Sequence, residues 1–298
     1  MMAVDQRPCL SDLYNPESST DLQGNMSDRF KSLVVSGRLV RYIHGGEGTP
    51  AVVVDQGQGL SIERSFERPE PIGWARVFKE VQKSTRILMH DRAGLGSSDP
   101  PPIRQTSIEM VDDLRRVLAE AKIRPPYVLV GHSIGGFNVR LFAGKYPGEV
   151  AGVVLVDSSH PEQLTRFASA LPPETPGEAI PLKLLRRGPD ATLFREAIDI
   201  RVCAELAREI TTIGLKPLVV VSQSPLALAP PGMPVPVWEK MRLIWSELQS
   251  DLLGLSGIAR QVIASHAGHN IQLEEPGLVA DAILSVMRDV QRGVRRVH

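Results

Sequence analysis

The sequence predicts an α/β protein built on a mostly parallel sheet with helices on both faces. Short runs that are apolar at every position, such as residues 51–54 and 153–156, alternate with stretches in which apolar residues recur every three or four positions. Strands that are apolar throughout are buried on both faces, which is typical of a parallel sheet between two layers of helices. The 298 residues are enough for one large domain of this class.

The predicted elements follow one another in a regular order. Residues 1–30 are polar and irregular, so we expect a flexible N-terminal extension there. A hairpin then opens the core, because two β-branched segments flank the turn Ser36-Gly37. The first part of the core, residues 31–159, also contains predicted strands at 51–54, 86–89, 127–130 and 153–156 and predicted helices at 72–81, 108–121 and 133–145.

The alternation stops between residues 160 and 215, where prolines interrupt short amphipathic pieces and no run is typical of a strand. We expect this segment to form an inserted helical cap. Residues 216–298 complete the core with a strand at 218–221, a helix at 235–255, a strand at 261–264 and a last amphipathic helix.

Composition excludes several classes of protein. The 34 basic and 34 acidic residues cancel, so no basic surface for nucleic acid is expected. No apolar run approaches the roughly 20 residues that a membrane span needs. Cys9 and Cys203 are the only cysteines, which rules out a disulfide framework and a thiolate metal cage. No dinucleotide or phosphate-loop motif is complete, so no cofactor is expected.

The segment Gly131-His132-Ser133-Ile134-Gly135 has the pattern Gly-x-Ser-x-Gly between a predicted strand and a predicted helix. A tight turn at such a junction lifts the serine hydroxyl above the edge of the sheet. Side chains at positions 131 and 135 would crowd this turn, which explains the two glycines. Ser133 is therefore predicted to be a nucleophile, with Gly131, His132 and Gly135 in its elbow. An ordinary glycine-rich turn is the alternative.

An elbow at the start of a helix also presents a free backbone amide, that of Ile134, to a reacting carbonyl. A second donor is expected from the loop after the strand 51–54, which reads Asp55-Gln56-Gly57-Gln58-Gly59. Its glycines permit close approach to a substrate, so we predict the amide of Gly57 or Gln58 for this role. A turn that merely needs flexible glycines explains the same residues.

A serine hydroxyl needs a base to remove its proton, and histidine is suited because its unperturbed pKa is about 6.5. His269 follows the predicted strand 261–264, lies immediately before the last predicted helix, and comes after Ser133 in the chain. His266 is the alternative base. The two histidines could also bind a metal, but no third ligand is placed beside them, so no metal site is predicted.

The histidine must be oriented by a buried carboxylate. The residues after the strand 218–221 are Ser222-Gln-Ser-Pro225, which contain no acid. Asp157 directly follows the strand 153–156, at the edge where the sites of open α/β sheets gather. We therefore predict Asp157 as the acid, and Glu239, Glu247 and Asp251 are the alternatives.

With these pieces placed, the chain resembles the serine-nucleophile branch of the α/β-hydrolase superfamily, from about residue 31 to the C-terminus. The run His90-Asp91-Arg92-Ala-Gly94-Leu-Gly96-Ser-Ser-Asp99 resembles its Asp-Arg-x-Gly-x-Gly-x-Ser turn, which we interpret as structural, and residues 156–163 are similar to a run in bacterial members. The resemblance implies an eight-stranded sheet with a helical cap over the catalytic residues. Two features depart from it: Gln56-Gly57 replaces the common His-Gly, and the acid is relocated to Asp157.

These residues predict a serine hydrolase, similar to carboxylesterases and lipases, that forms an acyl-enzyme with an ester, lactone or thioester. Apolar side chains in the predicted cap suggest an apolar pocket and hence a small hydrophobic substrate; they belong to Phe167, Leu171, Leu184, Leu185 and Phe194. Packing of the cap onto the core explains the same residues. One alternative is carbon–carbon hydrolysis, lyase or perhydrolase chemistry on the same triad. Another is a non-catalytic ligand-binding protein on this scaffold.

The expected partner is thus a small-molecule substrate, with no nucleic acid and no membrane span. The first thirty residues contain no apolar core of a signal peptide, so we expect a cytoplasmic protein.

Overall fold

The computed structural model describes residues 30–66, 72–176, 180–187, 194–229 and 231–296. Residues 1–29, which belong to the predicted N-terminal extension, lie outside the described residues. Phe30 is buried, and its ring meets the ring of Phe66 edge-on with the centroids 5.5 Å apart. Among the described residues, Phe30 is therefore the first that packs onto the core.

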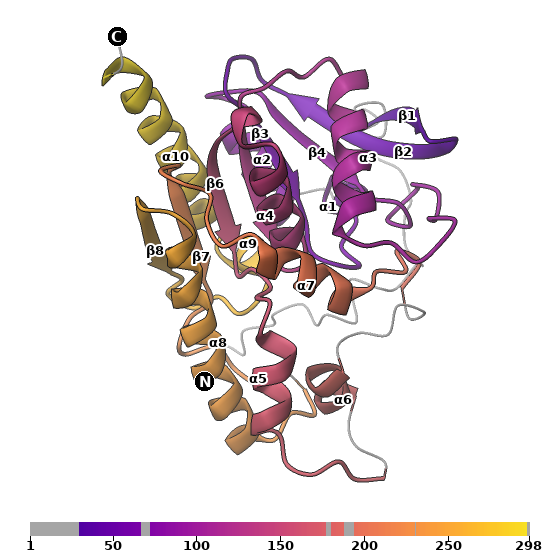
Figure 1. The fold of residues 1–298 in the computed structure, drawn as a ribbon, viewed down its shortest axis with the longest axis vertical. Coiled ribbons are helices and arrows are strands. Elements are labelled where there is room, and N and C mark those ends of the chain that lie inside the picture. Colours follow the sequence, from indigo (N-terminus) through magenta and orange to yellow (C-terminus); the bar gives the residue numbers. More distant parts are fainter. Residues whose placement is uncertain (1–29, 67–71, 177–179, 188–193, 230, 297–298) are drawn as a thin grey trace, which may run out of the picture.

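Eight strands form one sheet in the order β1-β2-β4-β3-β5-β6-β7-β8 (Figure 1). The pairs β1–β2 and β2–β4 are antiparallel, and all other pairs are parallel. The strands are β1 (Lys31–Val35), β2 (Arg38–Gly45), β3 (Ala51–Asp55), β4 (Ile87–Asp91), β5 (Tyr127–His132), β6 (Val150–Val156), β7 (Leu218–Ser222) and β8 (Ala259–Ile263). The predicted fold class, a mostly parallel eight-stranded sheet with helices on both faces, is confirmed.

The central strands are buried because helices cover both of their faces. Alternate residues of β3 enter different cores: Val52 and Val54 belong to one apolar cluster, and Val53 belongs to another. The first cluster also contains side chains of α2 (Trp74–Val81) and α10 (Pro276–Arg296). The second contains side chains of α3 (Ser107–Glu120) and α4 (Gly135–Lys145). Because both faces of the central strands are buried, most residues along these strands are apolar.

Between β6 and β7, the described part of the chain contains three helices, which pack against two different parts of the protein. Helices α5 (Gln163–Ala170) and α6 (Ile180–Arg187) project from one end of the sheet together with the start of α8 (Val235–Asp251), as Figure 1 shows. Helix α7 (Ile200–Glu209) packs against α4 beside the sheet. The short helices are α1 (Ile62–Phe66), α9 (Ile271–Glu274) and the 3-10 turns Pro147–Glu149 and Leu252–Leu255.

Three of the apolar residues proposed for a cap pocket, Phe167, Leu171 and Leu185, pack with α8 in a cluster of their own. The side chain of Leu184 lies outside the described residues, and that of Phe194 is half-buried. Packing thus accounts for the first three positions. Among the described residues, no helix combines the length and apolar character that crossing a membrane requires.

The end of β4 is tied to the loop that follows β3. Asp91 is buried and accepts hydrogen bonds from Gln56 Nε2 at 2.8 Å, Ser61 Oγ at 2.8 Å and the Ile62 amide at 2.7 Å. Burial raises the pKa of Asp91 from its ordinary 3.8 to about 6, because loss of solvent disfavours the charged form more than the three donors favour it.

The variant Asp91→Asn tests whether the pKa of Asp91 is raised in the folded protein. A carboxyl whose pKa is higher in the folded than in the unfolded chain contributes less to stability as the pH rises through the window between the two values. The free energy of unfolding of the wild type, relative to Asp91→Asn, should therefore fall by roughly 2 kcal/mol between about pH 4 and about pH 7. Urea unfolding at both ends of that range measures it, and a difference that does not change with pH contradicts the assignment.

Candidate active site

Ser133 occupies a strained turn between β5 and α4. Its φ angle is 52°, in the left-handed region that residues with a Cβ atom rarely adopt. The helix predicted from position 133 begins at Gly135, because the serine itself does not have helical backbone angles. Ser133 is half-buried, whereas every residue of β5 before it is buried.

The glycines on either side of Ser133 stand where no other residue fits. A Cβ atom on Gly131 would lie 2.7 Å from the carbonyl oxygen of Gly135. A Cβ atom on Gly135 would lie 2.1 Å from the carbonyl oxygen of Asp55, at the end of β3. Both approaches are to backbone, which cannot rotate away. The elbow is therefore held directly against the loop that follows β3.

The structure brings Ser133, His269 and Asp157 into one chain of hydrogen bonds. Nε2 of His269 lies 3.0 Å from Oγ of Ser133, and Nδ1 of His269 lies 2.7 Å from Oδ2 of Asp157. The Asp157 side chain is fully buried, whereas 46% of the His269 side chain is exposed. A neutral imidazole that donates Nδ1–H to the carboxylate presents a free electron pair on Nε2 to the hydroxyl.

Asp157 is held by further donors from two other elements. Its Oδ1 atom accepts a hydrogen bond from the amide of Gln223 at 2.9 Å and another from Nε1 of Trp245 at 2.9 Å. Gln223 directly follows β7, so the position that offers no acid in the sequence supplies a backbone donor instead. Trp245 comes from α8 and was not predicted as part of the site.

The alternative acids and the alternative base lie elsewhere. Glu239, Glu247 and Asp251 are exposed; the second pairs with Arg166 and the third with His160. His266 is exposed as well. Within the part of the chain that the structure describes, no group of three or more His, Cys, Asp or Glu side chains is arranged to hold a metal ion.

His132 supports the backbone of the base. Its ring is buried, and desolvation together with the neighbouring His269 lowers its pKa from 6.5 to about 3, so it is neutral. Nε2 of His132 lies 3.0 Å from the carbonyl oxygen of His269, and a neutral ring donates that hydrogen bond. The edge of Trp74 packs on the other side of His132, with the ring centroids 6.2 Å apart. His132 thus fixes the loop that carries the base.

The predicted oxyanion donors are three backbone amides, one in the elbow and two in the loop after β3. The amides of Ile134, Gly57 and Gln58 donate to no acceptor within the described chain. Ile134 directly follows the serine, and a Cβ atom on Gly57 would lie 2.8 Å from Nδ1 of His132. The predicted oxyanion donors therefore lie in loops that adjoin the elbow. Which of Gly57 and Gln58 serves as the second donor stays a prediction.

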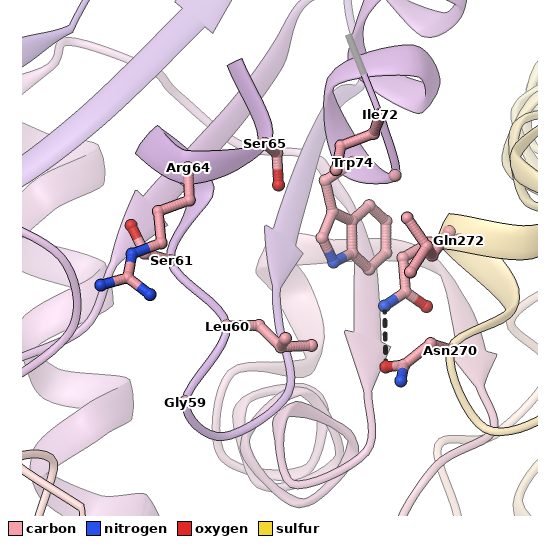
Figure 2. Close-up of a pocket in the computed structure, with 11 residues that line it drawn as sticks. Gly59, Leu60, Ser61, Arg64, Ser65, Ile72, Trp74, Asn270 and Gln272 are labelled. Carbon is pink, nitrogen blue, oxygen red and sulfur yellow. Dashed lines mark hydrogen bonds between the residues drawn. The ribbon is translucent and has the colours of Figure 1, made fainter. Parts of the chain in front are cut away.

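A hollow adjoins the loops that carry these groups (Figure 2). It contains about 560 Å³ of atom-free space, its open mouth included. Figure 2 shows Trp74 and Gln272 on one side of it and Leu60 on another, with Asn270 next to Gln272. Asn270 directly follows His269 in the chain, so a molecule in the hollow would contact the residue next to His269.

Both apolar and polar side chains line the hollow, and the polar ones belong to Ser61, Arg64, Ser65, Asn270 and Gln272. Leu60, Ile72 and Leu273 line it together with the indole of Trp74. The Nε1 atom of Trp74 and the Oε1 atom of Gln272 are buried and have no hydrogen-bond partner within the described chain. The apolar part of this lining suits an apolar group of a ligand.

Fold and site together define a hydrolase scaffold with a serine at the nucleophile position. The family model described as alpha/beta hydrolase fold matches residues 40–219. The chain belongs to this α/β-hydrolase family.

The chain is also similar to a curated sequence and to solved structures. An uncharacterized protein from Bacillus subtilis, YqjL, is 28% identical over 244 residues, which is 81% of this chain and 85% of that protein. A putative lipase from Acinetobacter baumannii has a TM-score of 0.61 at 19% identity and covers 93% of this chain and 100% of its own. A meta-cleavage product hydrolase from Pseudomonas fluorescens has a TM-score of 0.61 at 18% identity, with 87% and 97% covered. These two structures support the fold alone.

Asp157 can be tested against the exposed acids. Asp157→Asn leaves the shape unchanged but removes the charge that orients His269, so the reaction of Ser133 with a fluorophosphonate should slow by about 10⁴-fold. Glu247→Gln and Asp251→Asn are matched controls and should leave the rate within about twofold of the wild type. Stopped reactions analysed by intact-protein mass measure the rate. Near-normal labelling of Asp157→Asn contradicts the assignment.

Proposed function

We propose that the protein is a serine hydrolase that cleaves esters, including lactones or thioesters, of small hydrophobic acids through an acyl-enzyme intermediate. The observation that carries this proposal is the chain of hydrogen bonds from Ser133 through His269 to the buried Asp157. The strained serine, the half-exposed base and the fully buried acid each have the environment that their role needs.

In the proposed reaction, Oγ of Ser133 attacks the carbonyl carbon while Nε2 of His269 takes the hydroxyl proton. The carbonyl π electrons move onto the oxygen, and the tetrahedral intermediate collapses as the alcohol leaves with the proton from His269. Water then attacks the acyl-enzyme with the same base, which releases the acid and restores Ser133. Asp157 accepts from Nδ1 throughout, and it stabilises the imidazolium that forms in each half-reaction.

The negative charge on the intermediate needs donors that are already in place. The amide of Ile134 supplies one in this proposal, and the amide of Gly57 or Gln58 supplies the second. All three lack a protein acceptor in the described chain, so no internal hydrogen bond has to break when the oxyanion forms. The chemistry requires no cofactor.

The hollow supports the hydrophobic part of the proposal. The apolar part of its lining and its position next to the segment of His269 suit the acyl or alcohol group of an ester, held beside the reacting carbonyl. Each methylene buried there contributes about 0.8 kcal/mol to binding, so preference among esters should follow chain length.

Carbon–carbon hydrolysis is the second candidate, since a meta-cleavage product hydrolase shares the fold with a TM-score of 0.61, as the putative lipase does. The same serine and base serve that reaction when the leaving group is a carbanion. A binding protein without catalysis is the remaining alternative, and it predicts an unreactive Ser133.

A panel of p-nitrophenyl esters of increasing acyl length tests the main proposal. The wild type should turn over at least the short members and should be labelled by a fluorophosphonate. Ser133→Ala should lose both reactions, because the nucleophile is absent. Labelling without any ester turnover favours the carbon–carbon reaction, and the absence of both leaves only the binding protein.

The role of the hollow is tested by filling it. Ile72 lines the hollow and lies apart from the loops of Ser133 and His269 in sequence, so Ile72→Trp fills the space without changing those loops. The kcat/KM for the longest ester accepted should fall at least tenfold relative to that for the shortest, since about two methylenes lose their site. Leu215→Trp, at a position that is 78% exposed, is the control. An unchanged chain-length profile would place the acyl group elsewhere.

A further inference from the structure

Arg92 is a buried cation directly after β4, and it lies between two buried carboxylates. Its guanidinium group forms ion pairs with Asp55, at the end of β3, and with Glu196, whose Oε1 atom lies 2.7 Å from Nη2. The side chains of all three residues are at most 2% exposed. Removing such charges from water is costly, so the geometry around the group must be close to fully satisfied.

The remaining donors of Arg92 hold the loop that contains the predicted oxyanion donors. Nη1 donates to the carbonyl oxygen of Gln56 at 2.5 Å, and Nη2 donates to that of Gly57 at 3.1 Å. A trans peptide is planar, with its N–H opposite its C=O. Turning these two carbonyls toward Arg92 therefore turns the amides of Gly57 and Gln58 away from it. Neither amide has an acceptor within the described chain.

Glu196 fixes the other end of the same loop. Its Oε2 atom accepts the amide of Gly59 at 2.6 Å, while its Oε1 atom accepts from Arg92. On the opposite side, the loop abuts the elbow, because a Cβ atom on Gly57 would lie 2.8 Å from the His132 ring. The loop of residues 56–59 is thus clamped between two buried side chains and the turn that carries Ser133.

We propose that Arg92 and Glu196 are positioning residues for the oxyanion hole: they hold the loop 56–59 so that the amides of Gly57 and Gln58 meet the charge that develops on the substrate. The inference rests on the acyl transfer proposed above. The sequence predicted only a structural role for the turn that contains Arg92. Glu196, on the connection between α6 and α7, was not predicted to take part in the site.

The test compares Glu196→Ala and Glu196→Gln with the control Arg195→Ala. Glu196→Ala removes the side-chain hydrogen bonds to the Gly59 amide and to Arg92. Glu196→Gln has one acceptor oxygen, which can accept from the Gly59 amide or from Arg92 but not from both. Arg195 is exposed, and its side chain contacts the carbonyl of Gly96 rather than the loop 56–59. For each variant, kcat and KM are measured on the preferred ester, together with the Kd of a trifluoromethyl ketone whose hemiketal oxyanion occupies the hole.

Misplacing catalytic donors by about 1 Å costs roughly 10²-fold in rate. We expect Glu196→Ala to lower kcat about 100-fold and Glu196→Gln about 10-fold, with KM within about threefold of the wild type. The affinity for the ketone should fall by the same factor as kcat/KM, while Arg195→Ala changes neither. A normal kcat in folded Glu196→Ala, or a loss of thermal stability without weaker ketone binding, overturns the proposal.

Amide hydrogen exchange decides the matter where Glu196→Ala does not fold or where the wild type has no ester substrate. In the wild type, the Gly59 amide should exchange at least about 100-fold more slowly than in an unstructured peptide, because its acceptor is buried. Glu196→Gln should accelerate it, and Arg195→Ala should not. If the Gly59 amide of the wild type exchanges as fast as in an unstructured peptide, Glu196 does not hold the loop and the proposal is wrong. A wild type that neither turns over esters nor reacts with a fluorophosphonate contradicts the proposed function instead.

Discussion

The site depends on a carboxylate that is fully removed from water. Asp157 is 0% exposed, and a charge in that environment is tolerated only where fixed donors replace its hydration shell. Those donors come from three different parts of the chain: the amide of Gln223 after β7, the indole of Trp245 on α8 and the ring of His269. Satisfying one carboxylate therefore fixes where two strand ends, one helix and the loop of the base lie.

A second constraint acts on the opposite side of the serine. The glycines of the elbow let α4 approach the end of β3 so closely that no side chain fits between them. The loop after β3 is then confined by backbone on one side and by Asp91 and Arg92 on the other. Ser133 thus lies between two supports: the hydrogen-bonded pair of His269 and Asp157, and the loop after β3.

How much of this could be predicted from the sequence depends on how far each contact reaches along the chain. The turn at Ser133 is a local requirement, so five residues and their flanks suffice to predict it. The positions of Asp157 and His269 follow from a general property of parallel sheets, because strand ends that are distant in sequence meet at one edge. Trp245 and Glu196 have no such signal. Whether a tryptophan on an amphipathic helix faces the core or the site depends on how α8 packs, and Glu196 stands in a connection that has no motif.

The residues that escaped prediction show how the segments outside the central sheet contact the candidate site. Trp245 stacks on Phe167 of α5 with the ring centroids 5.8 Å apart, and its ring lies edge-on to His269 at 6.1 Å. The apolar cluster of α5, α6 and α8 therefore continues through one indole into contact with the base and the acid. Glu196 makes the corresponding connection from the segment before α7 to the loop after β3. Because both connections are made by buried side chains, a change in the packing of these helices alters the geometry around Ser133 without touching any residue of its motif.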